Sequence, residues 1–230
     1  MPVTVTTACT RASAVAKLPG LGRMSIYQRI MGHPFVYNKI RPLVVGIDMS
    51  PVYRKLEVSA DDVVVDVGCG TGDALNYLTD FRAYHGFDTD QTAIAFAREK
   101  ARDRPGVHFA SDMLTAADLA RIRPTRLVMY GLLHHLSDDD AVALLKMAGA
   151  ADSVARIVTQ DVIYLPGQLV NNALARLDRG RFVRTLEGYR QLIARSGLRL
   201  VDQEVVQSHP KRGLAKYLVM VLEHGRTHSA

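Results

Sequence analysis

The order of apolar and polar residues predicts strands that alternate with helices along most of the chain. Residues 63–67 form a nearly uninterrupted apolar run, which is typical of a strand covered on both faces of a sheet. Similar runs predict further strands at residues 83–87, 107–110, 126–133, 156–165, 198–206 and 216–223. Helical spacing of apolar residues predicts helices shortly after residue 72, at 91–102, at 116–121, after Ser137 and at 185–196.

Polar residues mark several helix ends. Asp90 suits a helix N-cap, and Gly197 suits a helix C-terminus. Ser137 can cap the helix that follows it, with Asp140 completing a capping box. The acidic triplet 138–140 also matches the positive end of a helix dipole, and a metal-binding role for it is the weaker alternative.

The succession of elements predicts the fold class. Strands separated by helices favour parallel pairing, whereas the last two strands have no helix between them and favour an antiparallel pair. We therefore predict an α/β fold: a doubly wound, mostly parallel seven-stranded sheet with an antiparallel last strand and N-terminal accessory helices.

The chain divides into a tail, an accessory segment and one main domain. Residues 1–24 are rich in Thr, Ala and Ser and contain no acid, so we interpret them as a tail, with a targeting leader as the alternative. Spaced apolar residues predict two short helices within residues 25–45, in an accessory segment of residues 25–60 that would serve as a lid. Residues 61–230 form the main domain, in which 164–184 are a lid insertion.

Composition matches an ordinary globular protein. Apolar residues make up 48% of the 230 positions and charged residues 23%, which argues against wholesale disorder. No apolar run approaches the length of a membrane span. Cys9 and Cys69 are too few for a disulfide scaffold, which predicts a reducing compartment and a cytoplasmic location.

The net charge of +6 lies entirely in the first 47 residues, which contain six basic residues and no acidic ones. After position 47, 23 basic residues are balanced by 23 acidic residues. Nucleic-acid-binding domains concentrate basic charge on a folded face. We therefore expect neither a nucleic acid nor a membrane as a partner.

The strongest chemical signal is a glycine-rich turn at the end of the first strand. Gly68, Gly70 and Gly72 let the backbone turn tightly and approach a ligand. The dinucleotide-binding fingerprint requires Gly or Ala where Asp73 stands, so that fingerprint fails. Asp66 precedes the turn, and its carboxylate would repel a pyrophosphate but attract an ammonium group. The motif favours a nucleoside that carries an amino-acid cation; a glycine turn without a ligand is the alternative.

Two more acids follow the next two predicted strands. Asp88 can accept hydrogen bonds from ribose hydroxyls, and its alternative role is a favourable charge at a helix N-terminus. Asp112 can accept a hydrogen bond from the adenine amine while Met113 packs on the ring, or it can cap the following helix. Parallel strands bind ligands at their carboxyl ends, so we expect these acids to converge there.

With these residues, the chain resembles the class I S-adenosylmethionine-dependent methyltransferases over residues 63–223. The resemblance implies S-adenosylmethionine as the cofactor, backbone at Tyr130 and Gly131 beneath its sulfonium, and Tyr37, or less well Tyr27, at its carboxylate. The implied cofactor-binding residues are Tyr37, Asp66, Gly68, Gly70, Gly72, Asp88, Asp112, Met113 and Tyr130.

The fourth strand leads into the sequence Leu-His-His-Leu, which is similar to a segment common in methyltransferases of metabolites. A neutral imidazole beside the transferable methyl group can remove a proton from the acceptor. His134 and His135 are the candidate catalytic residues, with His135 preferred, and a structural role for one of them stays open. A metal site would need further ligands at suitable spacing, and none is evident, so we predict no metal.

Missing motifs narrow the reaction. The Asn/Asp-Pro-Pro-Tyr/Phe motif of nucleic-acid amino methyltransferases is absent, and neither cysteine follows a proline as in cytosine C5-methyltransferases. Metal-dependent catechol methyltransferases place an aspartate near the end of the fourth strand, where this chain has Tyr130 and Gly131. Asp161 on the fifth strand does not make that site alone.

The lid insertion and its surroundings are rich in arginine. These residues could clamp an anionic acceptor, but we favour a solvated helix face paired with acids such as Asp178 and Glu187. The arginines are Arg176, Arg179, Arg181, Arg184 and Arg190.

We therefore predict a metal-independent methyltransferase that acts on a small-molecule acceptor. The alternatives are an RNA- or protein-modifying methyltransferase and a binding protein that keeps the cofactor without transferring methyl. The acceptor, the attacking atom and the choice between a single chain and a homodimer stay open.

Overall fold

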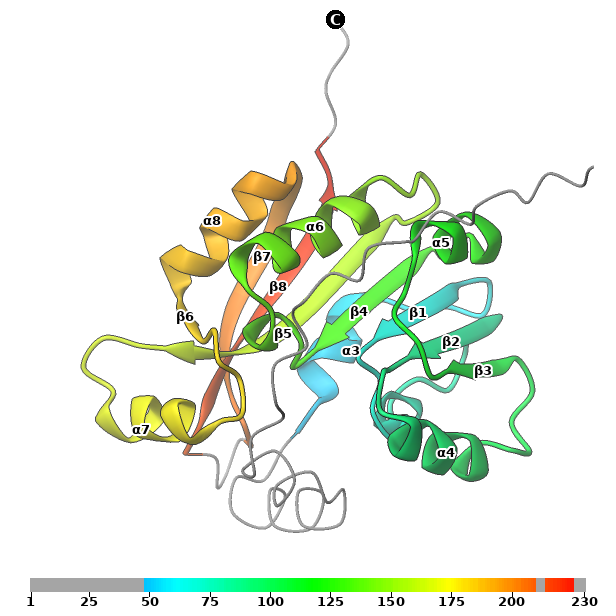
Figure 1. Ribbon diagram of the computed structural model, residues 1–230, viewed down its shortest axis with the longest axis horizontal. Coiled ribbons are helices and arrows are strands. Elements are labelled where there is room, and N and C mark those ends of the chain that lie inside the picture. Colours follow the sequence, from blue (N-terminus) through cyan, green and yellow to red (C-terminus); the bar gives the residue numbers. More distant parts are fainter. Residues whose placement is uncertain (1–47, 210–213, 226–230) are drawn as a thin grey trace, which may run out of the picture. The chain divides into compact units, whose positions relative to one another are not determined.

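A computed structural model describes residues 48–209 and 214–225 (Figure 1). The tail at 1–24, the two short helices expected before residue 45, and Tyr27 and Tyr37 lie outside the described residues. Within the described residues, no helix is both long enough and apolar enough to cross a membrane.

The described chain forms one mixed sheet, as predicted. Its order is β3-β2-β1-β4-β5-β8-β7, and β6 pairs with β5 off this path. Strands β1 to β5 pair in parallel, whereas β8 is antiparallel to both β5 and β7. The strands are β1 Val63–Val67, β2 Ala83–Phe87, β3 Val107–Ala110, β4 Arg126–Tyr130, β5 Arg156–Tyr164, β6 Arg184–Thr185, β7 Leu198–Gln207 and β8 Lys216–His224.

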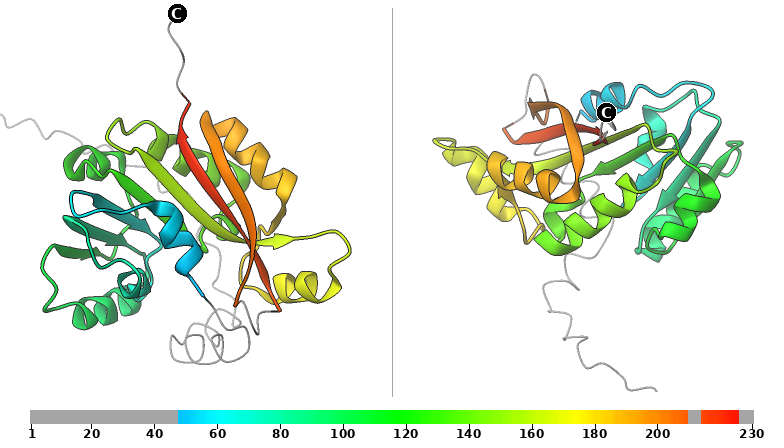
Figure 2. Two further views of the ribbon diagram at one scale, coloured as in Figure 1. Left: turned by 180° about the vertical axis from the view of Figure 1, so that it is seen from behind. Right: turned by 90° about the horizontal axis from the view of Figure 1, so that it is seen from above.

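Helices cover both faces of the sheet. The helical elements are α3 Ser50–Leu56, η1 Asp73–Asn76, α4 Gln91–Lys100, α5 Ala116–Ile122, η2 Leu133–His135, α6 Asp138–Gly149, α7 Leu169–Leu177 and α8 Leu186–Ser196. Figure 2 shows α3 on one side of the sheet and α6 and α8 on the other. The doubly wound arrangement is therefore confirmed.

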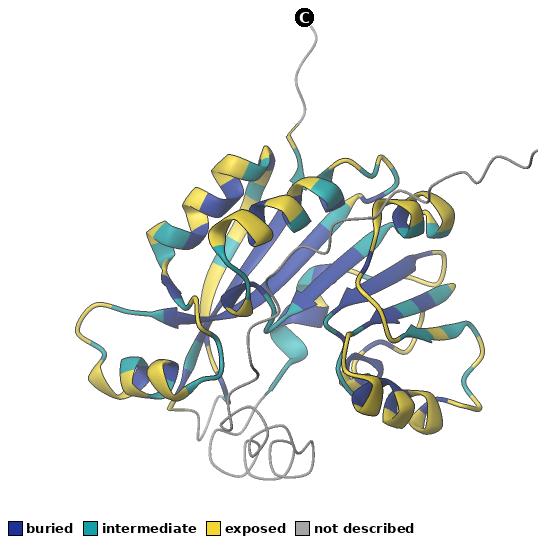
Figure 3. Ribbon diagram, viewed as in Figure 1, coloured by how far each residue is buried: buried dark blue, intermediate teal, exposed yellow. Residues whose placement is uncertain are grey.

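Two apolar clusters lie on the two faces of the sheet. Val65 of β1 packs in one cluster with buried residues of α5, α6 and α8, and Val64 packs in the other with α3 and η1. Every residue of β1 is buried because both faces are covered, which explains its nearly uninterrupted apolar sequence. Figure 3 shows the central strands buried and the outer sides of the helices exposed.

The element after the glycine turn differs from the prediction. We expected a helix running through Ala74, Leu75 and Leu78, but only the short 3-10 helix η1 forms. The guanidinium of Arg104 donates hydrogen bonds to the carbonyls of Leu75 and Leu78, at 2.6 Å each. Those carbonyls would accept bonds from the next turn of a longer helix, so Arg104 satisfies them instead.

The fourth strand is shorter than predicted. It ends at Tyr130, and η2 occupies the end of the stretch assigned to the strand. Gly131 turns the chain because it adopts a φ of +65°, a conformation that favours glycine. The backbone N–H of His134 then donates to the carboxylate of Asp161 and leaves the sheet ladder.

The predicted helix ends at Asp90, Ser137 and Gly197 hold, and two helices were missed. The predicted capping box is incomplete, because the Asp140 carboxylate accepts a hydrogen bond from the hydroxyl of Ser137 and not from its backbone N–H. Asp90 accepts hydrogen bonds from two backbone N–H groups of α4, and Ser137 accepts one from Asp140. Gly197 ends α8 in the left-handed conformation. The missed helices are α3 and α7; α7 leaves Leu169 and Leu177 exposed, so its apolar residues do not mark one buried face.

Candidate active site

The glycine turn after β1 has a geometry that only glycine fits. Gly68, Gly70 and Gly72 all have positive φ. A Cβ on Gly72 would lie 2.9 Å from the ring of Phe109, whereas a Cβ on Gly70 would meet open space. The turn is therefore packed closely at Gly72 and accessible at Gly70, as a backbone cradle for a ligand requires.

Asp66 lies in β1 just before this turn and is 2% exposed. Its Oδ2 accepts a hydrogen bond of 2.6 Å from the hydroxyl of Tyr84, while its buried Oδ1 has no hydrogen-bond partner among the described residues. Burial raises the pKa of Asp66 to about 7, although the Tyr84 hydrogen bond lowers it. An orphaned carboxylate oxygen in a buried setting is suited to a cation.

Asp88 lies at the carboxyl end of β2, beside the glycine turn. Its Oδ2 accepts a hydrogen bond of 2.8 Å from the backbone N–H of Gly70, and its Oδ1 accepts one of 2.9 Å from Asp90. The half-buried carboxylate thus ties the turn to the next strand. Each oxygen keeps a lone pair, so further hydrogen bonds from ribose hydroxyls fit its chemistry.

Asp112 and Met113 follow β3, and both are exposed. Asp112 accepts a hydrogen bond from the backbone N–H of Met113, and Met113 is 69% exposed. The alternative role of Asp112 as a helix cap is wrong, because Thr115 caps α5 and forms a capping box with Asp118. The structure thus places Asp66, Asp88 and Asp112 at or near the carboxyl ends of three adjacent strands.

His134 occupies a different environment at the end of β4, 1% exposed. Its Nδ1 lies 2.7 Å from Oδ1 of Asp161, and its Nε2 lies 3.0 Å from Oδ1 of Asp178. Burial lowers the pKa of His134, but the hydrogen bonds to both carboxylates outweigh burial and raise it to about 9. His134 is therefore an imidazolium held between two acids at neutral pH.

Part of the predicted lid insertion is packed onto this histidine. A Cβ on Gly180 would overlap the His134 ring, and the backbone N–H of Phe182 donates to the His134 carbonyl at 2.9 Å. The N–H of Gly180 donates to Asp178, which holds that carboxylate in place. Residues 178–182 thus close over η2.

Arg184 corrects one expectation about the arginine-rich segment. It is buried, not solvated, and its guanidinium donates to the carbonyls of Leu133, Leu136 and Phe182. It also pairs with Asp138 at 2.7 Å. Asp138 therefore serves as an ion-pair partner besides its place in the first turn of α6.

His135 is exposed, and its ring lies against that of His134, with centroids 4.2 Å apart. Together with Asp178, the two histidines place potential metal-ligating atoms within 4.8 Å of one another. Both nitrogens of His134 already contact carboxylates, so a metal would have to displace a proton and rearrange these contacts. Tyr130, at the end of β4, is half-buried beside this loop.

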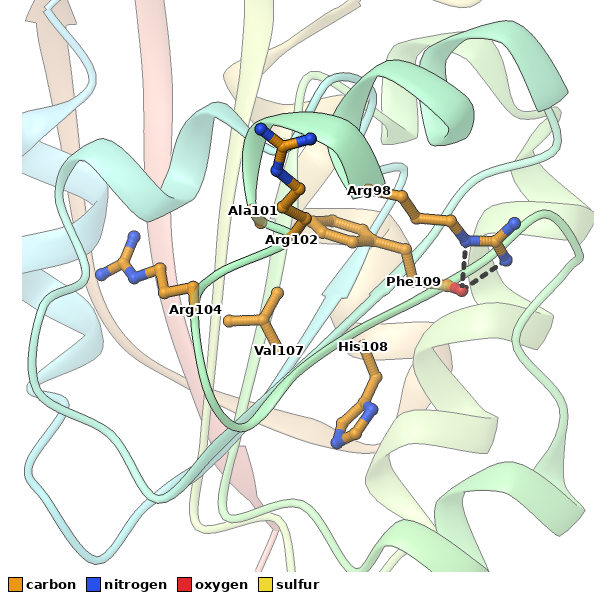
Figure 4. Close-up of a pocket in the computed structure, with 7 residues that line it drawn as sticks. All are labelled: Arg98, Ala101, Arg102, Arg104, Val107, His108 and Phe109. Atoms are coloured by element: carbon orange, nitrogen blue, oxygen red, sulfur yellow. Dashed lines mark hydrogen bonds between the residues drawn. The ribbon is translucent and has the colours of Figure 1, made fainter.

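A separate hollow of about 310 Å³ lies between α4 and β3, and Figure 4 shows its side chains. Arg98 donates two hydrogen bonds to the carbonyl of Phe109 there. The guanidinium groups of Arg98 and Arg104 both donate hydrogen bonds to backbone carbonyls. This hollow is therefore a poor candidate for binding an anionic ligand. Its lining residues are Arg98, Ala101, Arg102, Arg104, Val107, His108 and Phe109.

Comparison with known proteins agrees with this geometry. Residues 64–151 match a family model described as a methyltransferase domain. This segment of the chain therefore carries a methyltransferase domain. No curated protein matches the sequence significantly.

Solved structures share the fold of this methyltransferase domain at low identity. An S-adenosylmethionine-dependent methyltransferase from Methanosarcina mazei is 16% identical over 77% of this chain and 99% of its own, with a TM-score of 0.57. Geranyl diphosphate C-methyltransferase from Streptomyces coelicolor is 14% identical over 75% and 78%, with a TM-score of 0.55. Magnesium protoporphyrin IX methyltransferase from Synechocystis is 17% identical over 89% and 90%, with a TM-score of 0.52.

The residues of this site fit S-adenosylmethionine, the cofactor that the sequence resemblance implies, in the chemistry of their donors. The open space at Gly70 admits a ligand beside the backbone, and the orphaned oxygen of Asp66 suits an ammonium group. Sequence reasoning missed Tyr84 and the roles of Asp161, Asp178 and Arg184. Asp161 had a signal: an acid inside a long apolar strand needs a buried partner.

Proposed function

We propose that this methyltransferase acts on a small-molecule acceptor without a metal. The observation that carries the proposal is the balance of charge after residue 47, with 23 basic and 23 acidic residues, which provides no excess of positive charge for a polyanion. Two proteins of the same fold support the small-molecule acceptor, though not the absence of a metal, by their names: geranyl diphosphate C-methyltransferase, whose structure contains Mg²⁺, and magnesium protoporphyrin IX methyltransferase.

Each proposed cofactor-binding residue has a defined task. Asp66 binds the ammonium group, and the backbone of Gly68, Gly70 and Gly72 borders the methionine end. Asp88 binds the ribose hydroxyls, Asp112 and Met113 bind the adenine, and the backbone at Tyr130 borders the reacting end. The assignment of Tyr37 to the cofactor carboxylate concerns a residue outside the described ones. When bound, S-adenosylmethionine supplies an electrophilic methyl group, so the chain mainly aligns the acceptor and excludes water.

We assign the role of general base to His135. A base must be neutral to accept a proton, and the pKa of about 9 makes His134 a cation at neutral pH. His134 instead holds the loop that presents His135. A hydroxyl acceptor would need this base, whereas a neutral amine would need it less.

A labelled-methyl assay tests the function directly. The purified protein is incubated with methyl-labelled S-adenosylmethionine and with separate metabolite, RNA and protein fractions of a cell extract, with and without EDTA. We expect label in the metabolite fraction, unchanged by EDTA. Label only in RNA or protein would support the rival enzymes, and cofactor binding by calorimetry without any transfer would support a binding protein.

The ribose contact is tested by Asp88→Ala. We expect S-adenosylmethionine to bind more weakly by about 1–3 kcal/mol, because ribose hydrogen bonds and the tie to Gly70 are both lost. Asp90→Ala is the matched control. It removes the α4 cap and should lower the free energy of unfolding by about 1 kcal/mol without weakening the binding of S-adenosylmethionine. Equal affinity of Asp88→Ala and the unmodified protein in calorimetry would remove the assignment.

The base is tested by His135→Ala. We expect the methyl-transfer rate to fall about 100-fold or more for a hydroxyl acceptor, with cofactor affinity nearly unchanged. His108→Ala, an exposed histidine on β3, is the control and should leave the rate intact. Full turnover by His135→Ala on a hydroxyl acceptor would contradict the role.

A further inference from the structure

Tyr84 makes a contact that the proposed cofactor residues do not explain. It lies in β2 directly opposite Val64 of β1, and its ring is fully buried in the cluster under α3 and η1. Its hydroxyl is the only part that needs a polar partner, and that partner is Asp66, 2.6 Å away. A phenylalanine would fill nearly the same volume, so packing alone does not account for the hydroxyl.

The bond makes the two oxygens of Asp66 unequal. Oδ2 is held by Tyr84, whereas buried Oδ1 has no hydrogen-bond partner among the described residues. Burial raises the pKa of Tyr84 well above its ordinary value, so the phenol stays protonated and remains a donor. Tyr84 therefore fixes the orientation of the carboxylate through one oxygen and leaves the other one unused.

Within the part of the chain that the structure describes, the ionisable groups around Asp66 do not provide a cation. The described groups that act on it or on which it acts are the neutral Tyr53 of α3, Tyr84 of β2 and Cys69 of the turn, and the acids Asp73 and Asp88. A buried carboxylate in such surroundings resists ionisation, and the pKa of Asp66 is about 7. An incoming ammonium group would supply the missing positive charge.

We propose, on the basis of the proposed cofactor site, that Tyr84 is a positioning residue: it anchors one oxygen of Asp66 and presents the other to the ammonium group of S-adenosylmethionine. Binding of that group then requires Asp66 to be ionised. If the carboxyl is protonated beforehand, its proton passes to the buffer, and the ammonium group keeps all of its own protons. Recognition of the amino-acid end is thus linked to pH, whereas recognition of the adenosine end is not.

The test compares two ligands that differ only at the amino-acid end. S-adenosylhomocysteine carries the ammonium group, and 5′-methylthioadenosine lacks the amino-acid portion. For Tyr84→Phe we expect at least a tenfold loss of affinity for S-adenosylhomocysteine at pH 7, and less than a twofold change for 5′-methylthioadenosine. Tyr189→Phe is the matched control, because Tyr189 is also fully buried and donates to the carbonyl of Val162, away from the turn.

A second measurement needs no variant. Calorimetry of the unmodified protein at pH 6.5, in buffers of different ionisation heat, counts the protons released on binding. We expect release of protons with S-adenosylhomocysteine and none with 5′-methylthioadenosine.

In Asp66→Asn the proton release should vanish. Adding Tyr84→Phe to Asp66→Asn should weaken the binding of S-adenosylhomocysteine no further.

The outcomes separate the two proposals. Failure of the unmodified protein to bind either nucleoside would overturn the proposed cofactor site itself. Binding of both nucleosides with equal proton release, or an equal loss of both affinities in Tyr84→Phe, would overturn only the role of Tyr84.

Discussion

The domain contains two fully buried aspartates in the central part of its sheet, and their surroundings are opposite. Asp161 of β5 contacts the imidazolium of His134, and Arg184 acts on it from nearby. Among the described residues, the carboxylate of Asp66 in β1 accepts a hydrogen bond only from the hydroxyl of Tyr84, and acids lie around it. Both carboxylates keep one oxygen without a hydrogen-bond partner among the described residues, but only Asp161 has a cation in place.

This difference indicates a structural role for the region around Asp161 and a ligand-binding role for the region around Asp66. At β4 and β5 the charges are paired within the protein, and they hold η2 and residues 178–184 together. At β1 and β2 the described residues supply no counter-charge for Asp66, which costs stability in the free protein and favours a cationic ligand. The first region should therefore lose stability when it is changed, and the second should gain stability and lose affinity.

The largest effect is expected for His134→Ala. It leaves Asp161 buried without its cation, so the free energy of unfolding should fall by about 3–5 kcal/mol in urea at pH 6. Because the folded-state pKa of His134 is raised to about 9, its stabilising contribution is complete below pH 6.5 and is lost as pH rises through 9. The difference between the two proteins should shrink accordingly at pH 9.5, and equal stabilities at pH 6 would refute the pairing.

A smaller loss is expected for Arg184→Lys. The ammonium group of lysine cannot replace a planar guanidinium that donates to three carbonyls and to Asp138. The free energy of unfolding should therefore fall by about 2–3 kcal/mol. Arg181→Lys, on an exposed arginine of the same segment, should change stability by less than about 0.5 kcal/mol. Equal changes in the unfolding free energies of Arg184→Lys and Arg181→Lys, measured in urea, would contradict a stabilising role for the buried contacts of Arg184.

The smallest expected change in stability, that of Asp66→Asn, is an increase. In Asp66→Asn the buried charge is gone, so the cofactor-free protein should be more stable by about 1–2 kcal/mol at pH 8. The folded-state pKa of Asp66 is raised from 3.8 to about 7, so its destabilising contribution is absent below pH 3.8 and complete above pH 7. Thermal unfolding should therefore show a gain at pH 8 and little change at pH 4, whereas a loss at pH 8 would contradict the comparison.

Several features were predicted because their signals are local. The strands stand out as short apolar runs, and the caps at Asp90 and Ser137 depend on backbone groups two or three residues away. The helix α7 was missed because its apolar residues Leu169 and Leu177 remain exposed. The end of β4 was placed too late because apolar residues continue past Gly131 into η2.

The sequence by itself determined the order of the long strands and most of the helices, the glycine turn, and the acids at or near the carboxyl ends of β1, β2 and β3. These depend on apolar periodicity and on the conformational freedom of glycine, which act over a few residues. Only the tertiary structure decided that His134 meets Asp161, 27 residues away, that Arg184 meets Asp138, 46 residues away, and that Tyr84 holds Asp66. Such contacts depend on which strands lie side by side and which face each side chain occupies, and that is settled by the packing of the whole sheet.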